Sequence, residues 1–266
     1  MPTPFFSLHQ LGWRPGYAQQ LTIEDFEAGY PARVAGVHRH GLTVLSSRGT
    51  ALVTLPSHRA ASSETAITVG DWVLIEQHAD RVLRLIERQS LMVRVAAGGE
   101  HRLQSIAANL DSLFIVTSCN DDFNPSRLER YLALAFEAAV TPVIVLSKAD
   151  TSDDAMAYVT EARQIAPGVA ILLVNATDAT SVTQLHPWLQ SGQTVALVGS
   201  SGVGKSTLTN RLVGNTLQLT AAIREDDAKG RHTTTAREMY ALASGAWLID
   251  TPGMHWRGPC RGKRGL

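Results

Sequence analysis

The sequence predicts an α/β protein in which an N-terminal OB-fold β-barrel is followed by a parallel sheet with helices on both faces. Three observations predict this fold. Short apolar segments crowd residues 31–87, apolar strands alternate with helical segments after about residue 105, and a glycine-rich loop at residues 199–206 stands between a strand and a helix. The 266 residues are enough for one or two domains with a sizeable core.

The segments between residues 31 and 87 are rich in Val, Leu and Ile and are separated by clusters of Gly, Ser and His. Five short strands so close together are typical of a small barrel such as the OB-fold. Trp72 lies within one of them, which favours a core position over a platform for stacking bases. Residues 1–29 show little pattern. The expected strands are 32–38, 42–47, 50–55, 71–77 and 81–86.

The alternation of strands and helices begins with an apolar segment at 110–117. Asn124 and Pro125 are typical of an N-cap and a first helical residue, and apolar residues then recur at helical spacing. A parallel sheet built from βαβ units is the expected result. The further elements are strands at 142–146, 170–174 and 195–198, a helix at about 152–165, and a hairpin of 239–242 and 246–249 on the edge of the sheet.

Composition excludes several classes of protein. Hydrophobic residues make up 44% of the chain, which excludes wholesale disorder, and 24 basic against 24 acidic residues exclude a strongly basic nucleic-acid coat. The two cysteines, Cys119 and Cys260, are too few for a disulfide scaffold or for a zinc site of three or four cysteines. No secretory signal or membrane-length apolar run is visible, so we expect a soluble cytoplasmic protein.

Residues 199–206 match the phosphate-loop pattern G-x-x-x-x-G-K-[ST] after an apolar strand and before a helical segment, which is the context that supports it. Glycines let main-chain N–H groups curl around phosphate oxygens, and the helix N-terminus adds a favourable dipole. We expect Lys205 to reach the β- and γ-phosphates and Ser206 to bind Mg²⁺. The nucleotide-binding residues of this loop are Gly199, Ser200, Ser201, Gly202, Val203, Gly204, Lys205, Ser206 and Thr207.

Downstream, the segment Asp-Thr-Pro-Gly at 250–253 follows an apolar strand. Asp250 is placed to hold the Mg²⁺ shell, as the Walker-B aspartate does, and the main-chain N–H of Gly253 can bind the γ-phosphate.

A threonine-rich segment, residues 229–235, lies between these two motifs. One of its threonines can close over Mg²⁺ when the γ-phosphate is present, which makes a switch. Thr234 is favoured over Thr233 and Thr235 as this metal ligand. His232 can assist hydrolysis or contact a partner, and a solvated loop histidine is an equally good interpretation.

Upstream, Ser-Lys-Ala-Asp at 147–150 ends a buried strand. The carboxylate of Asp150 can accept hydrogen bonds from guanine N1–H and the exocyclic amine, whereas adenine offers an acceptor at N1, so such a site rejects ATP. Lys148 would lie along the base plane, and a second base-contacting loop is expected after the strand 170–174. The base-binding residues are Ser147, Lys148, Ala149, Asp150, Asn175 and Ala176.

The order of the motifs is unusual. GTPases usually place the phosphate loop first, then the switch threonine, Asp-x-x-Gly and Asn-Lys-x-Asp, but here the base motif precedes the phosphate loop by about 50 residues. Joining the usual ends and cutting the chain elsewhere gives this order. The sequence therefore predicts a circularly permuted P-loop GTPase domain after the barrel.

This arrangement resembles the circularly permuted GTPases of the ribosome small-subunit-dependent GTPase A family (RsgA/YjeQ-like) over residues from about 31 to 253. The resemblance implies an OB-fold that binds ribosomal RNA, a GTPase domain and a C-terminal zinc domain. It also implies action in late maturation of the small ribosomal subunit, which stimulates GTP hydrolysis. The specific marks are the segments 69–73, 107–111, 127–132, 147–150, 199–206, 229–235 and 250–253.

Four regions are expected on this basis: an N-terminal extension (1–30), an RNA-binding OB-fold (31–95), the GTPase domain (105–254) and an atypical tail (255–266). The zinc ligands of the family are absent from this chain. Segment 31–95 has eight arginines against five acidic residues, a surplus compatible with phosphate contacts: Arg33, Arg39, Arg48, Arg59, Arg81, Arg84, Arg88 and Arg94.

Two residues depart from the usual GTPase pattern. Ser147 stands where the base motif usually has Asn, and its shorter hydroxyl predicts weaker guanine affinity with the preference for guanine kept by Asp150. Met254 stands where many GTPases have the Gln that orients the attacking water. A thioether cannot do this, so we expect slow intrinsic hydrolysis that a partner completes.

The function expected is hydrolysis of GTP to GDP and phosphate with Mg²⁺, in small-subunit maturation, with Lys205, Thr234 and His232 as catalytic residues and Ser206, Thr234 and Asp250 as metal ligands. The expected partners are GTP or GDP, the 30S subunit and 16S rRNA, with no DNA and no membrane, and the chain is expected to be a monomer. Two alternatives remain: a P-loop ATPase or kinase, or an RNA-binding module with an inactive nucleotide site.

Overall fold

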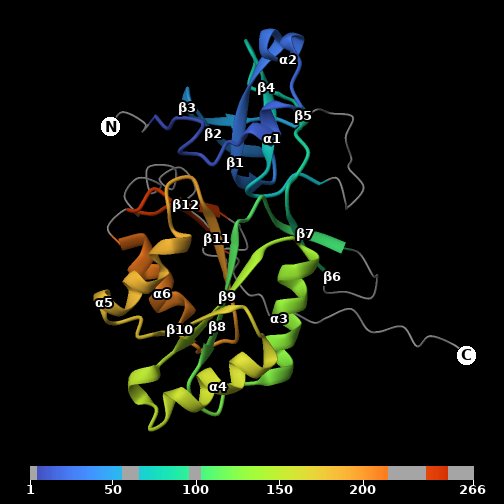
Figure 1. The fold of residues 1–266 in the computed structure, drawn as a ribbon. Helices are drawn as coiled ribbons and strands as arrows, with labels where there is room; N and C mark the ends of the chain where they lie inside the picture. Colours follow the sequence, from blue (N-terminus) through green and yellow to red (C-terminus); the bar gives the residue numbers. More distant parts are fainter. Residues whose placement is uncertain (1–4, 56–65, 96–102, 215–237, 251–266) are drawn as a thin grey trace, which may run out of the picture.

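The computed structural model describes residues 5–55, 66–95, 103–214 and 238–250. In these residues eleven strands form one hydrogen-bonded sheet, nine along a single path and two branching from its barrel end, with a barrel at one end and a helix-covered sheet at the other (Figure 1). The predicted α/β fold, with an OB-type barrel followed by a largely parallel sheet, is confirmed.

The barrel is formed by five antiparallel strands near the N-terminus. The first strand pairs with both the second and the fourth, and an isolated parallel bridge between Thr54 and Arg81 joins the third to the fifth. This closed path is the OB topology. Its interior is apolar, with Val34, Val44 and Val73 fully buried. The strands are β1 (Gly29–His38), β2 (Gly41–Ser46), β3 (Gly49–Val53), β4 (Trp72–Glu76) and β5 (Val82–Leu85).

Strand β1 belongs to both halves of the molecule. Its register with β2 shifts between Val34 and Gly36, and Gly36 also pairs with Glu238 in β12 (Glu238–Ala241) of the second sheet. A bulge of this kind bends a strand and increases its twist, which lets one strand serve two sheets. The barrel and the second sheet are therefore continuous through β1.

The second sheet contains six strands in the order β10-β9-β8-β11-β13-β12. Its first five strands are parallel, and β12 is antiparallel to its neighbour. The predicted hairpin is confirmed at the edge of this sheet, where β13 lies beside β11, and β12 also pairs with β1 of the barrel. The remaining strands are β8 (Ser112–Ser118), β9 (Thr141–Ser147), β10 (Ala170–Val174), β11 (Thr194–Val198) and β13 (Trp247–Asp250).

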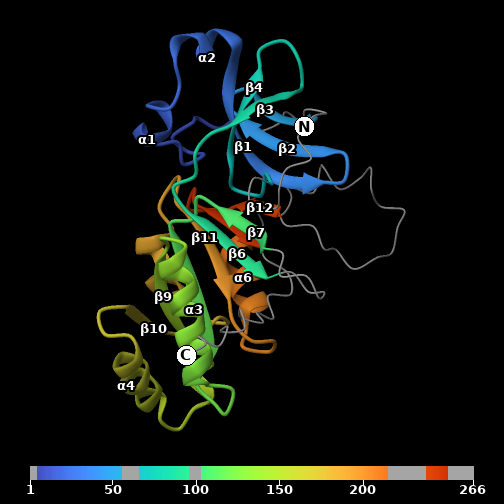
Figure 2. The ribbon, with the colours of Figure 1, turned by 90° about the vertical axis from the view of Figure 1, so that its right-hand side faces the viewer.

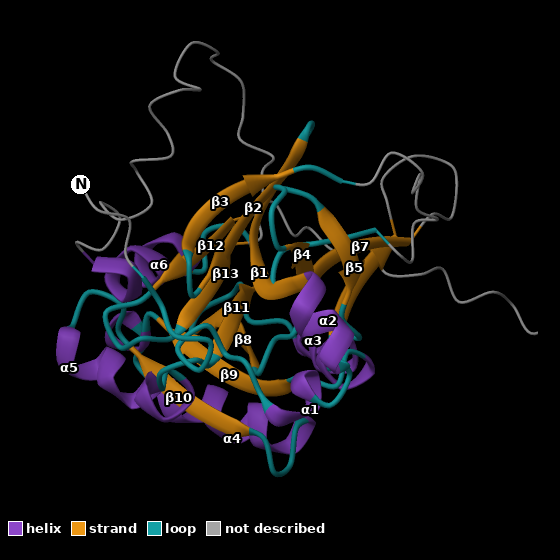
Figure 3. Cartoon of the chain, turned by 90° about the horizontal axis from the view of Figure 1, so that it is seen from above, coloured by secondary structure: helices purple, strands orange, loops and turns teal. Residues whose placement is uncertain are grey.

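Helices cover both faces of this sheet (Figures 1 and 2). Helices α3 (Pro125–Glu137) and α4 (Ala155–Ile165) pack on one face. The other carries α5 (Ala179–Val182), the 3₁₀ helix η2 (Thr183–Trp188) and α6 (Lys205–Val213), and Figure 3 shows α5 and α6 opposite α3. Alternate residues of β8 enter the two cores, with Ile115 in one and Phe114 in the other. This two-sided burial explains the continuous apolar runs of the parallel strands.

The predicted start of α3 is confirmed, since the Asn124 side chain accepts a hydrogen bond from the N–H of Arg127 and Pro125 is the first helical residue. Helix α4 begins at Ala155, later than expected, because Asp154 supplies the N-cap. In the described residues no helix is long and apolar enough to span a membrane.

Several elements were not predicted. The hairpin of β6 (Leu91–Val95) and β7 (Leu103–Ala108) stands apart from the barrel, although β6 lies within the segment assigned to it. Helices α1 (Pro15–Ala18) and α2 (Ile23–Ala28) are too short for a helical period to show in the sequence. They belong to an N-terminal segment that is far from featureless, because Leu11 and Tyr17 are buried in the main core.

Candidate nucleotide site

The expected nucleotide loops gather at the carboxyl ends of the parallel strands. The phosphate loop follows β11, the two base loops follow β9 and β10, and Asp250 ends β13. Ligands of open α/β sheets bind at this edge, in the crevice outside the strand ends. Sequence order does not matter here, because the sheet brings these strand ends together in space.

The phosphate loop leaves β11 at Gly199 and enters α6 at Lys205. Three of its glycines have positive φ angles: 149° at Gly199, 82° at Gly202 and 93° at Gly204. A Cβ atom on Gly199 would come within 2.1 Å of the main-chain oxygen of Val116 on β8, so only glycine fits there. The N-terminus of α6 then presents unpaired main-chain N–H groups and a positive dipole end, as phosphate binding requires.

Lys205 folds back onto its own loop. Its Nζ donates to the main-chain oxygen of Gly199 at 2.8 Å and to that of Ser200. Partial burial lowers the pKa of Lys205, because desolvation disfavours its charged form. Both acceptors are neutral carbonyl groups, so phosphate oxygens would be stronger partners for this ammonium group.

Two of the three metal-ligand candidates, Ser206 and Asp250, belong to elements at this edge of the sheet. Ser206 is exposed, and its hydroxyl forms no hydrogen bond within the described part of the chain. Asp250 ends β13, which pairs with β11 through Ala196 and Ile249. A hydroxyl and a carboxylate on neighbouring elements suit Mg²⁺, which takes few protein oxygens and keeps phosphate and water ligands. Among described residues, no group of three His, Cys, Asp or Glu could hold a metal.

Three predicted site residues, Thr234, His232 and Gly253, lie outside the described residues. The structure therefore places the phosphate loop, both base loops and the strand before Asp250, while the proposed switch remains a prediction.

Ser147 connects the base loop to the phosphate loop. It is buried at the end of β9, and its Oγ lies 2.6 Å from the main-chain oxygen of Val203 and 3.1 Å from that of Thr117. A hydroxyl has one proton to donate, so the shorter contact to Val203 takes most of it. The serine thus ties together two loops that are 56 residues apart in sequence.

The next residues of the base loop turn sharply. Lys148 has a left-handed φ of 57°, and Asp150 lies in the single 3₁₀ turn η1 (Ala149–Thr151). Asp150 is exposed, and its carboxylate has no hydrogen-bond donor among the described residues. A free, exposed carboxylate at this place can accept the paired donors of a guanine base.

The second base loop is held from two sides. The Asn175 side-chain oxygen accepts from the N–H of Thr177 at 2.9 Å and from its hydroxyl at 2.6 Å, so it stabilises its own turn. Arg211 of α6 donates to the main-chain oxygens of Thr177 and Ala176. The helix that carries the phosphate loop therefore also holds the base loop, a role for Arg211 that the sequence pattern did not reveal.

Arg127 is a second residue that the motifs did not single out for the site. It lies in the first turn of α3, and its Nη1 donates to the Ser200 hydroxyl in the phosphate loop. The contact spans 73 residues, so no local pattern could show it. Segment 127–132 was one of the marks of the family resemblance, but nothing within it points to the phosphate loop.

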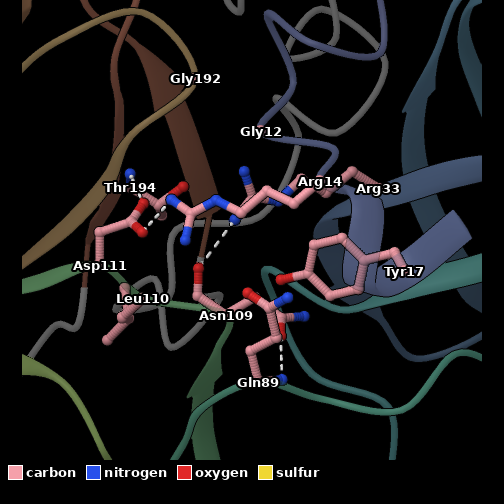
Figure 4. Close-up of a pocket in the computed structure, with 10 residues that line it drawn as sticks. All are labelled: Gly12, Arg14, Tyr17, Arg33, Gln89, Asn109, Leu110, Asp111, Gly192 and Thr194. Atoms are coloured by element: carbon pink, nitrogen blue, oxygen red, sulfur yellow. Dashed lines mark hydrogen bonds and ion pairs between the residues drawn. The ribbon is translucent and has the colours of Figure 1, made fainter. Parts of the chain in front are cut away.

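A cavity of about 20 Å³ lies at the opposite, amino-terminal end of β11 (Figure 4). Arg33, Asn109, Asp111 and Thr194 are among its lining residues, and Figure 4 draws the hydrogen bonds that join Asp111 to Thr194 and Arg33 to Asn109. This volume has room for a single water molecule and none for a nucleotide. The cavity is therefore part of the junction between barrel and sheet.

Comparisons with known proteins agree with this geometry. The family model described as RsgA GTPase matches residues 85–258. The small ribosomal subunit biogenesis GTPase RsgA 2 of Vibrio vulnificus is 50% identical over 94% of this chain and 70% of its own length. The small ribosomal subunit biogenesis GTPase RsgA of Mesorhizobium japonicum is 50% identical over 93% and 71%, and that of Xanthomonas campestris pv. campestris is 43% identical over 94% and 71%.

Solved structures share the fold. The crystal structure of YjeQ from Thermotoga maritima has a TM-score of 0.63 and 21% identity, covering 84% of this chain and 74% of that one. The structure of YloQ, described as a circularly permuted GTPase, has a TM-score of 0.58 and 23% identity, covering 85% and 72%. At these identities the likeness concerns the fold alone, and it agrees with the permuted strand order.

Proposed function

The chain belongs to the RsgA GTPase family, and on that premise we propose that it binds GTP and hydrolyses it to GDP and phosphate during biogenesis of the small ribosomal subunit. The observation that carries the proposal is the contact of 2.6 Å between the Ser147 hydroxyl and the main-chain oxygen of Val203. It joins a loop suited to a guanine base to a loop suited to phosphates, so that one nucleotide can occupy both.

The chain's own residues divide the work of binding. Lys205 exchanges loop carbonyls for the β- and γ-phosphate oxygens, and Asp150 accepts the donors of guanine. Ser206 and Asp250 would hold Mg²⁺, which neutralises charge on the phosphates when bound. The main-chain N–H groups at the start of α6 complete the phosphate site.

Hydrolysis needs groups outside the described residues. In this proposal Thr234 closes over the metal, and His232 assists hydrolysis or contacts a partner. Met254 stands where a glutamine would orient the attacking water, so we expect slow intrinsic turnover that the small subunit accelerates.

The barrel is proposed to bind 16S rRNA, but with fewer arginines than composition suggests. Arg33 is fully buried, and Arg84 and Arg88 form ion pairs with Asp25 and Asp71. Arg39, exposed at the turn between β1 and β2, remains available for phosphate contacts. Action as a monomer in the cytoplasm completes the proposal.

Competition binding tests the function directly. Labelled GDP bound to the chain should be displaced by GTP and not by ATP, and 30S particles should raise GTP turnover. Equal displacement by ATP would favour a P-loop ATPase or kinase. Binding of 16S rRNA fragments without any nucleotide binding would favour an RNA-binding module with an inactive site.

A further inference from the structure

Arg127 reaches from α3 to the phosphate loop. Its Nη1 donates to the Ser200 hydroxyl and, at 3.3 Å, to the main-chain oxygen of Asp122. Its main-chain N–H donates to the Asn124 side chain at 2.9 Å, which fixes the backbone from which the arginine extends. Because β8 and β11 are paired in parallel, the first turn of α3 and the phosphate loop lie side by side.

Two cations therefore hold Ser200, the second residue of the loop. Lys205 binds its main-chain oxygen, and Arg127 binds its side-chain oxygen. In the described part of the chain no carboxylate forms an ion pair with Arg127. A guanidinium stays charged at any working pH. Its positive charge thus stands beside the phosphate loop with neutral partners only, where it attracts an anion.

The two contacts differ in what happens when a nucleotide arrives. Lys205 must leave the carbonyl oxygens of Gly199 and Ser200 to reach phosphate oxygens, and the loop then loses two of its internal hydrogen bonds. The hydrogen bond from Arg127 uses a different atom of Ser200, so it can persist. A loop held in its binding conformation loses less conformational entropy when the ligand binds.

We propose that Arg127 is a positioning residue for the triphosphate: through Ser200 it holds the phosphate loop in its binding shape, and its charge favours GTP over GDP. This rests on the proposed GTP binding. The arginine has two separable effects. Its hydrogen bond to Ser200 increases the affinity for both nucleotides, whereas its positive charge increases the affinity more for GTP, which carries the larger negative charge.

The test compares Arg127→Ala, Arg127→Lys, Ser200→Ala and the double variant Arg127→Ala/Ser200→Ala with Arg163→Ala. Arg163 is an exposed arginine in the last turn of α4 and serves as the matched control. The measurements are dissociation constants for GDP and a non-hydrolysable GTP analogue, together with the melting temperature of the nucleotide-free chain.

We expect Arg127→Ala to weaken the GTP analogue roughly tenfold and GDP about threefold, and Ser200→Ala to weaken both about threefold. The double variant should be no weaker than Arg127→Ala, because the tie is lost only once. Arg127→Lys should regain the preference for GTP without full affinity. The melting temperature and the control should match the parent.

Three results would overturn the proposal: parent-like binding by Arg127→Ala, additive losses in the double variant, or equal weakening of both nucleotides with a lowered melting temperature, which marks a purely structural arginine. A parent chain that binds neither nucleotide would instead refute the proposed function. The two failures are therefore distinguishable.

Discussion

The two ends of strand β11 differ in how their polar groups are satisfied. At the amino-terminal end the Arg33 guanidinium is 1% exposed and donates to main-chain oxygens of three segments: Leu11 at 2.5 Å, Asn109 at 3.2 Å and Gly70 at 3.4 Å. At the carboxyl-terminal end Lys205 donates, within the described part of the chain, only to carbonyl oxygens of its own loop, and Asp150 is exposed. At the amino-terminal end, called the closed end below, the buried polar groups are hydrogen-bonded within the protein. At the carboxyl-terminal end, called the open end, polar side chains remain free to bind a ligand.

The amino-terminal end of β11 is buried because main-chain segments pack directly against each other there. A Cβ atom on Gly12 would lie 2.5 Å from the main-chain oxygen of Gly192, so the N-terminal segment and the turn before β11 touch directly. Asp111 receives the N–H of Thr194 at 2.7 Å and pairs with Arg14. Unpaired groups would be costly in such a buried place. At the carboxyl-terminal end, water can form hydrogen bonds with the exposed polar groups until a nucleotide replaces it.

Replacing Lys205 tests the open end most severely. Lys205→Ala removes the charge that meets the β- and γ-phosphates, and we expect GTP turnover to fall roughly 100- to 1,000-fold. Among the described residues only the loop carbonyls of Gly199 and Ser200 lose a hydrogen-bond donor, so thermal unfolding should change little. The measurement is steady-state GTP hydrolysis with a melting curve of the same sample. An unchanged hydrolysis rate in the folded variant would show that this end is not the phosphate site.

Asp150→Asn changes the specificity of the open end. An amide can offer a donor where guanine N1–H needs an acceptor, so we expect GDP affinity to fall roughly 100-fold while xanthosine diphosphate gains affinity. Titration with the two nucleotides measures both effects. GDP binding as tight as that of the parent would show that the loop after β9 does not bind the base.

The contrast between the two ends also explains what the sequence could predict. The phosphate loop and the cap at Asn124 were predictable because the sequence pattern of each lies in a short run of consecutive residues. The bond from the Trp247 indole to the Gln10 main-chain oxygen spans 237 residues, and that from Arg33 to Leu11 depends on how the N-terminal segment packs on the barrel. Such contacts follow from tertiary arrangement, so residues 1–29 seemed patternless. The roles of the site residues remain predictions.

Arg33→Met tests the closed end. The methionine keeps much of the buried volume but leaves the oxygens of Leu11, Gly70 and Asn109 without their donor, and we expect a loss of about 3 kcal/mol in unfolding free energy. Below the melting temperature GTP affinity should stay within about twofold of the parent.

The matched control for this variant is Arg81→Ala. Arg81 is 56% exposed and pairs with Glu76 on the barrel surface, so its loss should cost no more than about 1 kcal/mol. Denaturant unfolding of both variants gives the comparison. If Arg33→Met is as stable as Arg81→Ala, the joint at the amino-terminal end does not depend on the buried guanidinium.

Ser147 sharpens the comparison because it combines features of both ends: it is buried and bonded like Arg33, yet it lies in the nucleotide site. Ser147→Ala leaves the Val203 oxygen without its donor, and we expect about 1 kcal/mol lower stability and roughly three- to fivefold weaker GDP binding, since the two loops are no longer tied. Ser147→Asn supplies an amide donor of longer reach and should bind GDP at least as tightly as the parent. Calorimetric titration of the three chains decides. If Ser147→Ala is less stable but binds GDP as tightly as the parent, Ser147 has a structural role like that of Arg33. Nucleotide binding at the open end would then depend on exposed residues alone.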